Sequence, residues 1–338
     1  MRLERQLGET VVMVGEEPHK LRFRALAEGS LHLRSKLKRD DLDNVSYMEG
    51  EHYIVDYDEG TIRRQPGSSI PDWSEHSTYG KTEFNHSDYA NYSNRRFTLY
   101  TDYQYLRPDD DSEAESSPSM PGALSLLCKK LEQGEAITYV VFGDSISTGA
   151  EASGESMKYY HLFAAAVRER FPAASIQVRM KAVGGESSQG GLERLYRDVL
   201  SERPDLVTIG YGMNDQNRRS DGTNAVPPEQ FGKNISRMID DIRQHTKASI
   251  ILITPCLPNP HWKYASSNPT EYAEVLRKLG ADKQVAVADL QQIWLEELSA
   301  GKTPESLLLN NVNHPNDYGH LLYARALERL IPGESDLS

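Results

Sequence analysis

Cysteine is scarce in this sequence. The sequence also has neither a long apolar run nor a cluster of basic residues. Its 338 residues include only Cys128 and Cys256, which are too few for a disulfide framework and lack the spacing of a metal site. We therefore expect two free thiols in a reducing compartment. A small fold held together by disulfides or zinc is excluded.

The charge and the missing apolar runs narrow the class of protein further. The formal net charge of −12, with no run rich in Lys and Arg, argues against nucleic acid or an anionic membrane as a partner. The opening "MRLERQLGETVVMVGEE" lacks the apolar stretch of a secretion signal, and no apolar run approaches the roughly 20 residues of a membrane helix. These features predict a soluble, mildly acidic, cytoplasmic protein.

The chain is longer than one core usually needs, and its first part has the pattern of an all-β domain. In "HYIVDYDEGTIRRQPG" two β-rich runs flank Asp58–Gly60, which predicts a hairpin with glycine in the left-handed position. We expect residues 1–106 to form an antiparallel β-sandwich of the jelly-roll kind. Residues 107–122 are acidic and rich in Ser and Pro, so they predict a linker.

Aromatic residues are frequent in this first part. They could stack on sugars or on a partner chain, including a second copy, but in a small sandwich such rings more often fill the core. We favour the core for most of Tyr47, Tyr53, Tyr57, Trp73, Tyr79, Phe84, Tyr89 and Tyr92.

Residues 123–338 have a different pattern, in which apolar runs alternate with amphipathic segments. Such alternation predicts a doubly wound α/β domain with a five-stranded parallel sheet. Ligands of these sheets bind beyond the carboxyl ends of the strands. The expected buried strands are residues 137–142, 176–180, 206–211, 250–254 and 285–290.

Each of the first three strands is followed by a residue that suits acyl transfer. Ser145 follows the first, Gly184–Gly185 the second and Asn214 the third, while His314 precedes the last helix. A serine hydroxyl needs a nearby base such as imidazole, and the oxyanion formed on attack needs fixed donors. Neither the phosphate-binding pattern G-x-x-x-x-G-K-[ST] nor the dinucleotide pattern G-x-G-x-x-G occurs at the first strand end.

Four blocks of the sequence resemble those of the SGNH hydrolases, also called GDSL-type esterases and lipases. They are "FGDSISTG" with Ser145, "VGGESSQGGLERL" with Gly185, "GMND" with Asn214 and "NHPN" with His314. The resemblance implies that Ser145 is the nucleophile and His314 the base. It also implies an oxyanion hole made by Ser145, Gly185 and Asn214, with no metal and no organic cofactor.

One position departs from the pattern of that family. Its members usually carry Asp three residues before the histidine, where this chain has Asn311. The carboxylate holds the histidine tautomer and stabilises the imidazolium. Here either the Asn311 carbonyl or a main-chain carbonyl would orient His314. If the site simply lacks a charge that it could use, an Asn311→Asp variant should not be much slower.

Other polar and aromatic residues near these blocks have less specific roles. We expect Asp144 to organise the turn before Ser145, Asp215 to cap the segment that follows it, and His320 to lie on a helix surface. Trp262, in a loop after the fourth strand, could line an acyl or a sugar site.

A β-sandwich ahead of an SGNH domain resembles bacterial carbohydrate esterases that deacetylate xylan-type glycans. The resemblance implies a serine esterase acting on small-molecule or oligosaccharide esters, with imported xylo-oligosaccharides as candidates. A short-chain lipase, lysophospholipase or thioesterase is the alternative, because "GGESSQGGLERL" is also similar to the second block of bacterial multifunctional thioesterases. A third hypothesis is a glycan-binding protein without catalysis. Exposed tyrosines on the sandwich could support a homo-oligomer.

Overall fold

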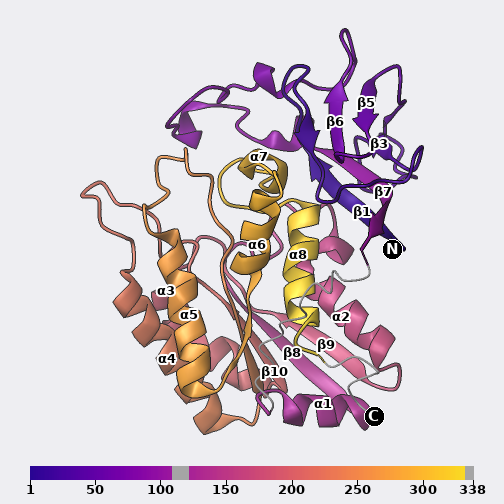
Figure 1. Ribbon diagram of the computed structural model, residues 1–338. Coiled ribbons are helices and arrows are strands. Elements are labelled where there is room, and N and C mark those ends of the chain that lie inside the picture. Colours follow the sequence, from indigo (N-terminus) through magenta and orange to yellow (C-terminus); the bar gives the residue numbers. More distant parts are fainter. Residues whose placement is uncertain (109–121, 332–338) are drawn as a thin grey trace. The chain divides into compact units, whose positions relative to one another are not determined.

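The structure, a computed structural model, describes residues 1–108 and 122–331 and divides into two compact units (Figure 1). The first unit comprises Met1–Glu115 with Leu295–Gly319, and the second comprises Ser116–Trp294 with His320–Ser338. The sequence-based division differs in one respect, because it assigned residues 295–319 to the second domain. The linker predicted at 107–122 lies, apart from its ends, outside the described residues.

The first unit contains two antiparallel sheets. A four-stranded sheet has the order β1-β7-β3-β4 and a three-stranded sheet the order β2-β6-β5. Their strands are β1 (Arg2–Val11), β2 (His19–Lys20), β3 (His32–Arg34), β4 (Ser46–Tyr47), β5 (Tyr53–Asp56), β6 (Thr61–Arg64) and β7 (Leu99–Arg107). Three short 3-10 helices lie between β6 and β7: η1 (Trp73–Glu75), η2 (His86–Asp88) and η3 (Asn94–Arg96).

The predicted hairpin is present between β5 and β6. Asp56 pairs with Thr61, and Gly60 in the turn has a φ of +64°. A Cβ at Gly60 would lie 2.1 Å from the carbonyl oxygen of Phe23, so both the backbone conformation and the close approach require glycine.

Side chains from both sheets share one apolar core, which confirms the predicted β-sandwich. Tyr47 and Tyr53 belong to this core, as expected for the aromatic residues, whereas Tyr79 is 46% exposed. The jelly-roll connectivity stays a prediction. The core residues from the strands are Val11, Leu33, Tyr47, Tyr53, Val55, Ile62, Leu99, Tyr103 and Tyr105.

Buried polar contacts explain why residues 295–319 belong to the first unit. Lys302 forms an ion pair with Glu9 of β1, and both side chains are buried. The Lys302 ammonium also donates to the Thr10 carbonyl at 2.8 Å, and the Thr10 hydroxyl donates to the Ser306 carbonyl at 2.5 Å. A buried charge without its partner is strongly destabilising, so this segment and β1 depend on one another.

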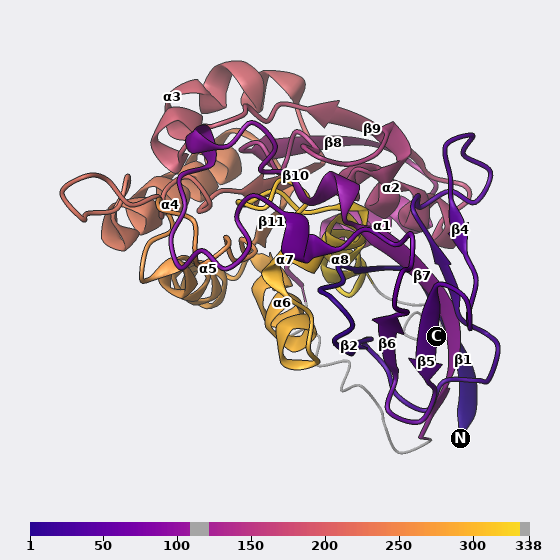
Figure 2. The same ribbon diagram turned by 90° about the horizontal axis from the view of Figure 1, so that it is seen from above.

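The second unit contains the predicted five-stranded parallel sheet, in the order β12-β11-β10-β8-β9. Figure 2 labels four of its strands, β8 to β11. Its direction of winding changes between β8 and β10, so the crevice at their carboxyl ends is the expected ligand site of such a fold. The strands are β8 (Ala136–Gly143), β9 (Ser175–Met180), β10 (Leu206–Gly210), β11 (Ser249–Ile253) and β12 (Ala286–Ala288).

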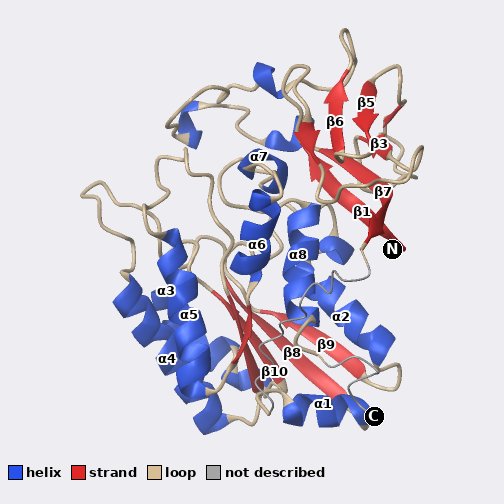
Figure 3. Ribbon diagram, viewed as in Figure 1, coloured by secondary structure: helices blue, strands red, loops and turns tan. Residues whose placement is uncertain are grey.

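Helices cover both faces of this sheet (Figure 3), as a doubly wound fold requires. Apolar side chains of α3 and α4 pack against β8, β10 and β11 in one buried cluster. The helices up to β12 are α1 (Ser125–Glu132), η4 (Glu155–Met157), α2 (Tyr159–Arg170), α3 (Ser188–Asp198), η5 (Leu200–Glu202), α4 (Pro228–His245) and α5 (Pro269–Lys283). After β12 come α6 (Leu290–Ser299), α7 (Pro304–Leu307) and α8 (Asp317–Glu328).

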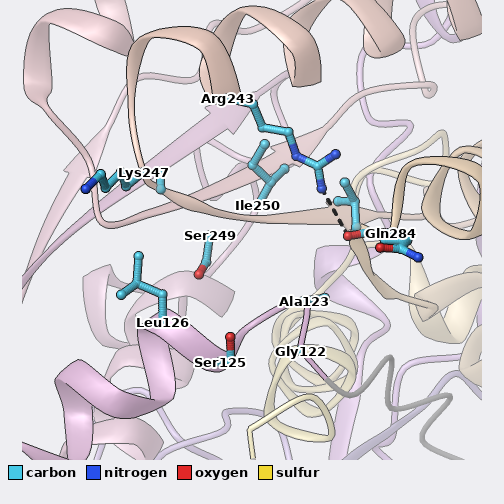
Figure 4. A pocket seen from close by; sticks show the side chains of 11 residues that line it. Gly122, Ala123, Ser125, Leu126, Arg243, Lys247, Ser249, Ile250 and Gln284 are labelled. Atoms are coloured by element: carbon cyan, nitrogen blue, oxygen red, sulfur yellow. Dashed lines mark hydrogen bonds between the residues drawn. The ribbon is translucent and has the colours of Figure 1, made fainter.

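A small pocket of about 160 Å³ lies at the amino ends of β11 and β12, beside the start of α1 (Figure 4). Arg243 on its rim donates to the Gln284 carbonyl at 3.0 Å, and the Lys247 side chain points away from the pocket. The pocket is therefore at the opposite edge of the sheet from the residues that follow the carboxyl ends of β8 and β10.

Candidate functional site

The carboxyl ends of β8 and β10 lie side by side, and glycines occupy both. Gly143 pairs with Gly210, and the Asp144 N–H donates to the Gly210 carbonyl at 3.2 Å. A Cβ at Gly143 would lie 2.3 Å from that same carbonyl oxygen, so glycine is needed there. Ser145 thus follows β8 in a tight turn at the point where the sheet changes its winding direction.

The backbone of this turn is fixed by hydrogen bonds. The Ser145 carbonyl accepts from the N–H groups of Thr148 and Ala150, at 3.2 and 3.1 Å, and from the Thr148 hydroxyl at 2.7 Å. Asp144 accepts from the Ile146 N–H at 2.9 Å, in agreement with the expected turn-forming role. Ser145 itself is 9% exposed, so a reacting group can reach it only from a restricted direction.

The Asp144 carboxyl is buried, and burial raises its pKa to about 7, with Asp215 contributing by repulsion. Near neutral pH this group is therefore only partly ionised. Its place inside the turn gives it a structural role beside Ser145.

The loop after β9 lies next to the same turn. The Val183 N–H donates to the Gly143 carbonyl at 3.0 Å, and a Cβ at Gly184 would lie 3.9 Å from the Ser145 Cβ. Gly185 has a φ of +75°, while no atom of the described residues comes within 4 Å of where its Cβ would be. Glycine is thus required at 185 by backbone conformation, and the space beside its backbone is open.

Asn214 connects the loops after β9 and β10. Its side-chain amide donates to the Glu186 carbonyl at 3.1 Å, one residue beyond Gly185. An amide nitrogen has two hydrogens, so this bond orients the group and leaves a second N–H as a donor.

Glu186 is in turn held by a charged network that the sequence did not suggest. Arg194 on α3 donates to its carboxylate from Nε at 2.8 Å and from Nη2 at 2.6 Å, and Tyr211 donates to it at 2.7 Å. The Arg194 guanidinium also lies 4.4 Å from the centre of the Phe142 ring. This network fixes the loop that carries Gly185, and the only sequence signal was an arginine on the inner side of a predicted helix.

Asp215 has a different partner from the expected one. It accepts from the Ser188 N–H at 3.0 Å and the Ser188 hydroxyl at 2.5 Å, at the start of α3, and from the Gly212 N–H at 3.1 Å. The prediction that it caps the segment after itself is therefore wrong, because its partners are at α3 and on its own loop. Burial raises its pKa to about 6.

His314 and Asn311 lie in the first unit, in the loop between α7 and α8. The Leu309 N–H donates to the His314 carbonyl at 2.9 Å, which closes the loop. The Asn310 side-chain oxygen accepts from the N–H groups of Val312, Asn313 and His314, at 3.0, 2.9 and 2.8 Å. Asn310 therefore fixes the backbone conformation of the loop that carries His314.

The Asn311 side chain is fully buried and bonded to residues far away in the sequence. Its Nδ2 donates to the Thr78 hydroxyl at 2.9 Å, and its Oδ1 accepts from Asn94 at 3.3 Å. Its φ of +58° is left-handed, a conformation that Asn tolerates. Asn94 and Thr78 could not be found from the sequence, since no motif connects them with residue 311.

Two further expectations can be compared with the structure. His320 is fully buried, stacks on Tyr159 and contacts the Ala150 carbonyl at 3.1 Å, so its predicted place on a helix surface was wrong. Trp262 is 6% exposed and packs edge-on against Tyr264. A role for this buried ring in lining the site stays a prediction.

Ser145, Gly185 and Asn214 thus come together in the second unit, at the carboxyl ends of β8, β9 and β10. His314 and Asn311 belong to the first unit. The pairing of Ser145 with His314 stays a prediction from the sequence motifs.

Both cysteines are free thiols. Within residues 1–108 and 122–331 no cluster of side chains is suited to hold a metal ion, and no helix is long and apolar enough to cross a membrane.

Comparison with known proteins gives a family match and several relatives. Residues 141–322 match the family described as GDSL-like lipase/acylhydrolase. An acetylxylan esterase from Geobacillus stearothermophilus is 24% identical over 215 residues, covering 60% of this chain and 96% of the relative. The esterase TesA from Pseudomonas aeruginosa is 28% identical over 160 residues, covering 46% of this chain and 73% of the relative.

Solved structures have the same fold. A two-domain esterase (CEX) active on acetylated mannans has a TM-score of 0.51 at 21% identity, over 62% of this chain. The match spans about half of that esterase, 52% of its chain. The acetylxylan esterase Axe2 from Geobacillus stearothermophilus has a TM-score of 0.50 at 24% identity, over 59% of this chain and 95% of its own.

Proposed function

Since the chain belongs to the GDSL-like lipase/acylhydrolase family and is a carboxylic ester hydrolase, we propose that it removes acetyl groups from carbohydrate esters. The observation that carries this proposal is the acetylxylan esterase relative, which aligns over 96% of its own length. The fold shared with an esterase active on acetylated mannans supports the same substrate class.

In the proposed reaction Ser145 is the nucleophile and His314 the general base. The imidazole takes the proton of the Ser145 hydroxyl while that oxygen attacks the acetyl carbonyl carbon. The C–O bond to the sugar then breaks, and the imidazolium gives its proton to the departing sugar oxygen. An acetyl-serine remains, which a water activated by His314 hydrolyses to acetate and free Ser145.

Negative charge develops on the acetyl oxygen in both steps, and we assign its stabilisation to three N–H donors. They are the backbone N–H groups of Ser145 and Gly185 and the Asn214 amide. The hydrogen bond from Asn214 to Glu186 supports this role, because it preorients the donor at no further cost during the reaction.

Two surfaces of the first unit suit a sugar better than an acyl chain. An open groove of about 840 Å³ beside β5 and β6 has a mixed lining, with apolar side chains such as Leu26, Ile54 and Val55 beside Tyr57, Arg63 and five carboxylates. The carboxylates are those of Glu16, Glu28, Asp56, Asp58 and Glu59. Carboxylates accept hydrogen bonds from sugar hydroxyls. Tyr79 is exposed and packs edge-on against Trp73, which gives an aromatic surface of the kind on which sugars stack.

The test is acid release from a matched panel of acetylated xylo- and manno-oligosaccharides and of acetyl and octanoyl aryl esters. We expect fast acetate release from the sugars, lost in Ser145→Ala. Preference for the octanoyl ester with no release from the sugars would contradict the proposal.

A short-chain lipase or thioesterase is the second candidate. The block "GGESSQGGLERL", which is similar to the second block of bacterial multifunctional thioesterases, favours it. The esterase TesA is 28% identical over 160 residues. That alignment covers 46% of this chain, against 60% for the acetylxylan esterase. The octanoyl ester in the same panel separates the two candidates.

A further inference from the structure

Asn94 makes an unusual set of contacts with the loop that carries His314. Its backbone N–H donates to the Leu309 carbonyl at 2.7 Å. Its Nδ2 lies 2.8 Å from the Leu308 carbonyl, 3.1 Å from the Glu305 carbonyl and 3.3 Å from Asn311 Oδ1. These side-chain partners are 211 to 217 residues away in the sequence, and the Asn94 side chain is fully buried.

Asn94 is itself fixed from the side of the β-sandwich. The Trp73 indole N–H donates to its Oδ1 at 2.8 Å, and its carbonyl accepts from the Phe97 N–H at 2.8 Å and the Thr98 hydroxyl at 3.0 Å. Both the side-chain oxygen and the side-chain nitrogen are thus engaged. A buried polar group that is satisfied in this way has one orientation, since any rotation leaves donors or acceptors unpaired.

Two backbone hydrogen bonds connect Asn94 with His314 through Leu309. Asn94 holds the Leu309 carbonyl, to which the Ser93 hydroxyl also donates at 2.9 Å, and the N–H of the same Leu309 donates to the His314 carbonyl. A second path runs through Asn311, whose amide lies between Asn94 and Thr78. The Thr78 hydroxyl in turn contacts His76 Nδ1 at 2.9 Å.

All of these bonds are made by uncharged groups, at the position where relatives of this chain are expected to use an aspartate. We propose that Asn94 is a positioning residue for His314, so that the segment between β6 and β7 acts through the base as part of the esterase. This inference rests on the proposed role of His314 as general base. It gives the first unit a part in catalysis that is independent of sugar binding.

The first test compares Asn94→Ala with Asn91→Ala, an exposed asparagine of the same segment, in the full chain with an aryl acetate. A displacement of a catalytic group by about 1 Å can lower the rate by about 100-fold. We expect kcat of Asn94→Ala to fall by about 10- to 100-fold, with KM changed by less than about twofold. Asn91→Ala should match the wild type.

The decisive measurement is the double variant Asn94→Ala/His314→Ala. If Asn94 acts through the base, the double variant is no slower than His314→Ala alone, because no base is left to position. An additive loss, or a raised KM with unchanged kcat, would overturn the proposal while leaving the proposed function intact. A His314→Ala variant as fast as the wild type would refute the proposed function, and the positioning role with it.

Thr78→Val serves where Asn94→Ala does not fold. Val nearly matches the volume of Thr and removes the hydroxyl that accepts from Asn311 and contacts His76. We expect a smaller fall in kcat, of about three- to tenfold, which again disappears in the His314→Ala background. A wild-type kcat for a folded Thr78→Val, together with a wild-type kcat for Ser93→Ala, would overturn the proposal.

Discussion

Replacing Asn311 by aspartate introduces the residue that the family usually carries, yet we expect it to impair this protein. The side chain is fully buried, and its amide donates to the Thr78 hydroxyl. In the variant an oxygen faces that hydroxyl instead. When the introduced group is ionised, Thr78 can satisfy it only by turning its proton away from His76, which breaks the contact between Oγ1 and Nδ1.

The size of the effect follows from these contacts. One buried hydrogen bond is lost, and a carboxylate is placed between the neutral side chains of Asn94 and Thr78. Together these two effects should lower the free energy of unfolding by about 1–3 kcal/mol. Burial favours the neutral acid, so the pKa of the introduced carboxyl group in the folded protein should be above its unfolded value. The variant's stability is then highest at low pH and is lost as pH rises through that folded pKa.

The assay is urea unfolding of wild type and Asn311→Asp at pH 5 and pH 8, with kcat for an aryl acetate at both pH values. Asn91→Asp adds the same charge at an exposed position and should change neither quantity. We expect Asn311→Asp to be less stable, more so at pH 8, and no faster than the wild type. A stable and faster variant would refute the reasoning and restore the simpler view that the site only lacks a charge.

Three other variants test separate parts of the site. Asn214→Ala should lower kcat of the aryl acetate by about 10²–10³-fold, as loss of one oxyanion donor does. Gly185→Ala should cost about 1–2 kcal/mol of unfolding free energy because of its left-handed φ of +75°, and more than Gly184→Ala, whose methyl group has room. Asp144 has a pKa of about 7 when folded against 3.8 when unfolded, so the folded state holds more protons and stability falls as pH rises from about 4 to about 7. Asp144→Asn should flatten this decline in urea unfolding, and an unchanged slope would contradict the assigned pKa.

The parallel sheet could be predicted because most of its strands, such as β8, β10 and β11, are apolar runs that are buried. The first was expected at 137–142 and spans Ala136–Gly143; the last was expected at 285–290 but ends at Ala288, since α6 begins at Leu290. The expectation of a buried strand at 176–180 was wrong in one respect, because β9 is an edge strand whose residues are exposed or half-buried. Ser145, Gly185 and Asn214 could be placed because each lies in the loop that follows one of these strands.

Residues with distant partners could not be predicted. His320 is a polar residue near the start of the last helix, and its burial, with the ring stacked on Tyr159, is visible only in the structure. The roles of Asn94, Thr78 and Lys302 depend on residues more than 200 positions away, and single buried polar side chains carry no periodic signal. The grouping of residues 295–319 with the first unit could not be foreseen for the same reason.

The ion pair between Lys302 and Glu9 has a consequence for how such a protein can evolve. A truncated hydrolase that begins at residue 123 would keep the buried Lys302. It would lose β1, whose Glu9 neutralises the charge of that lysine. It would also leave the carbonyls of Leu308 and Leu309 without their donors from Asn94. The amino-terminal strands are therefore not a detachable module, and gene rearrangements that shuffle accessory domains should leave this pair of segments together.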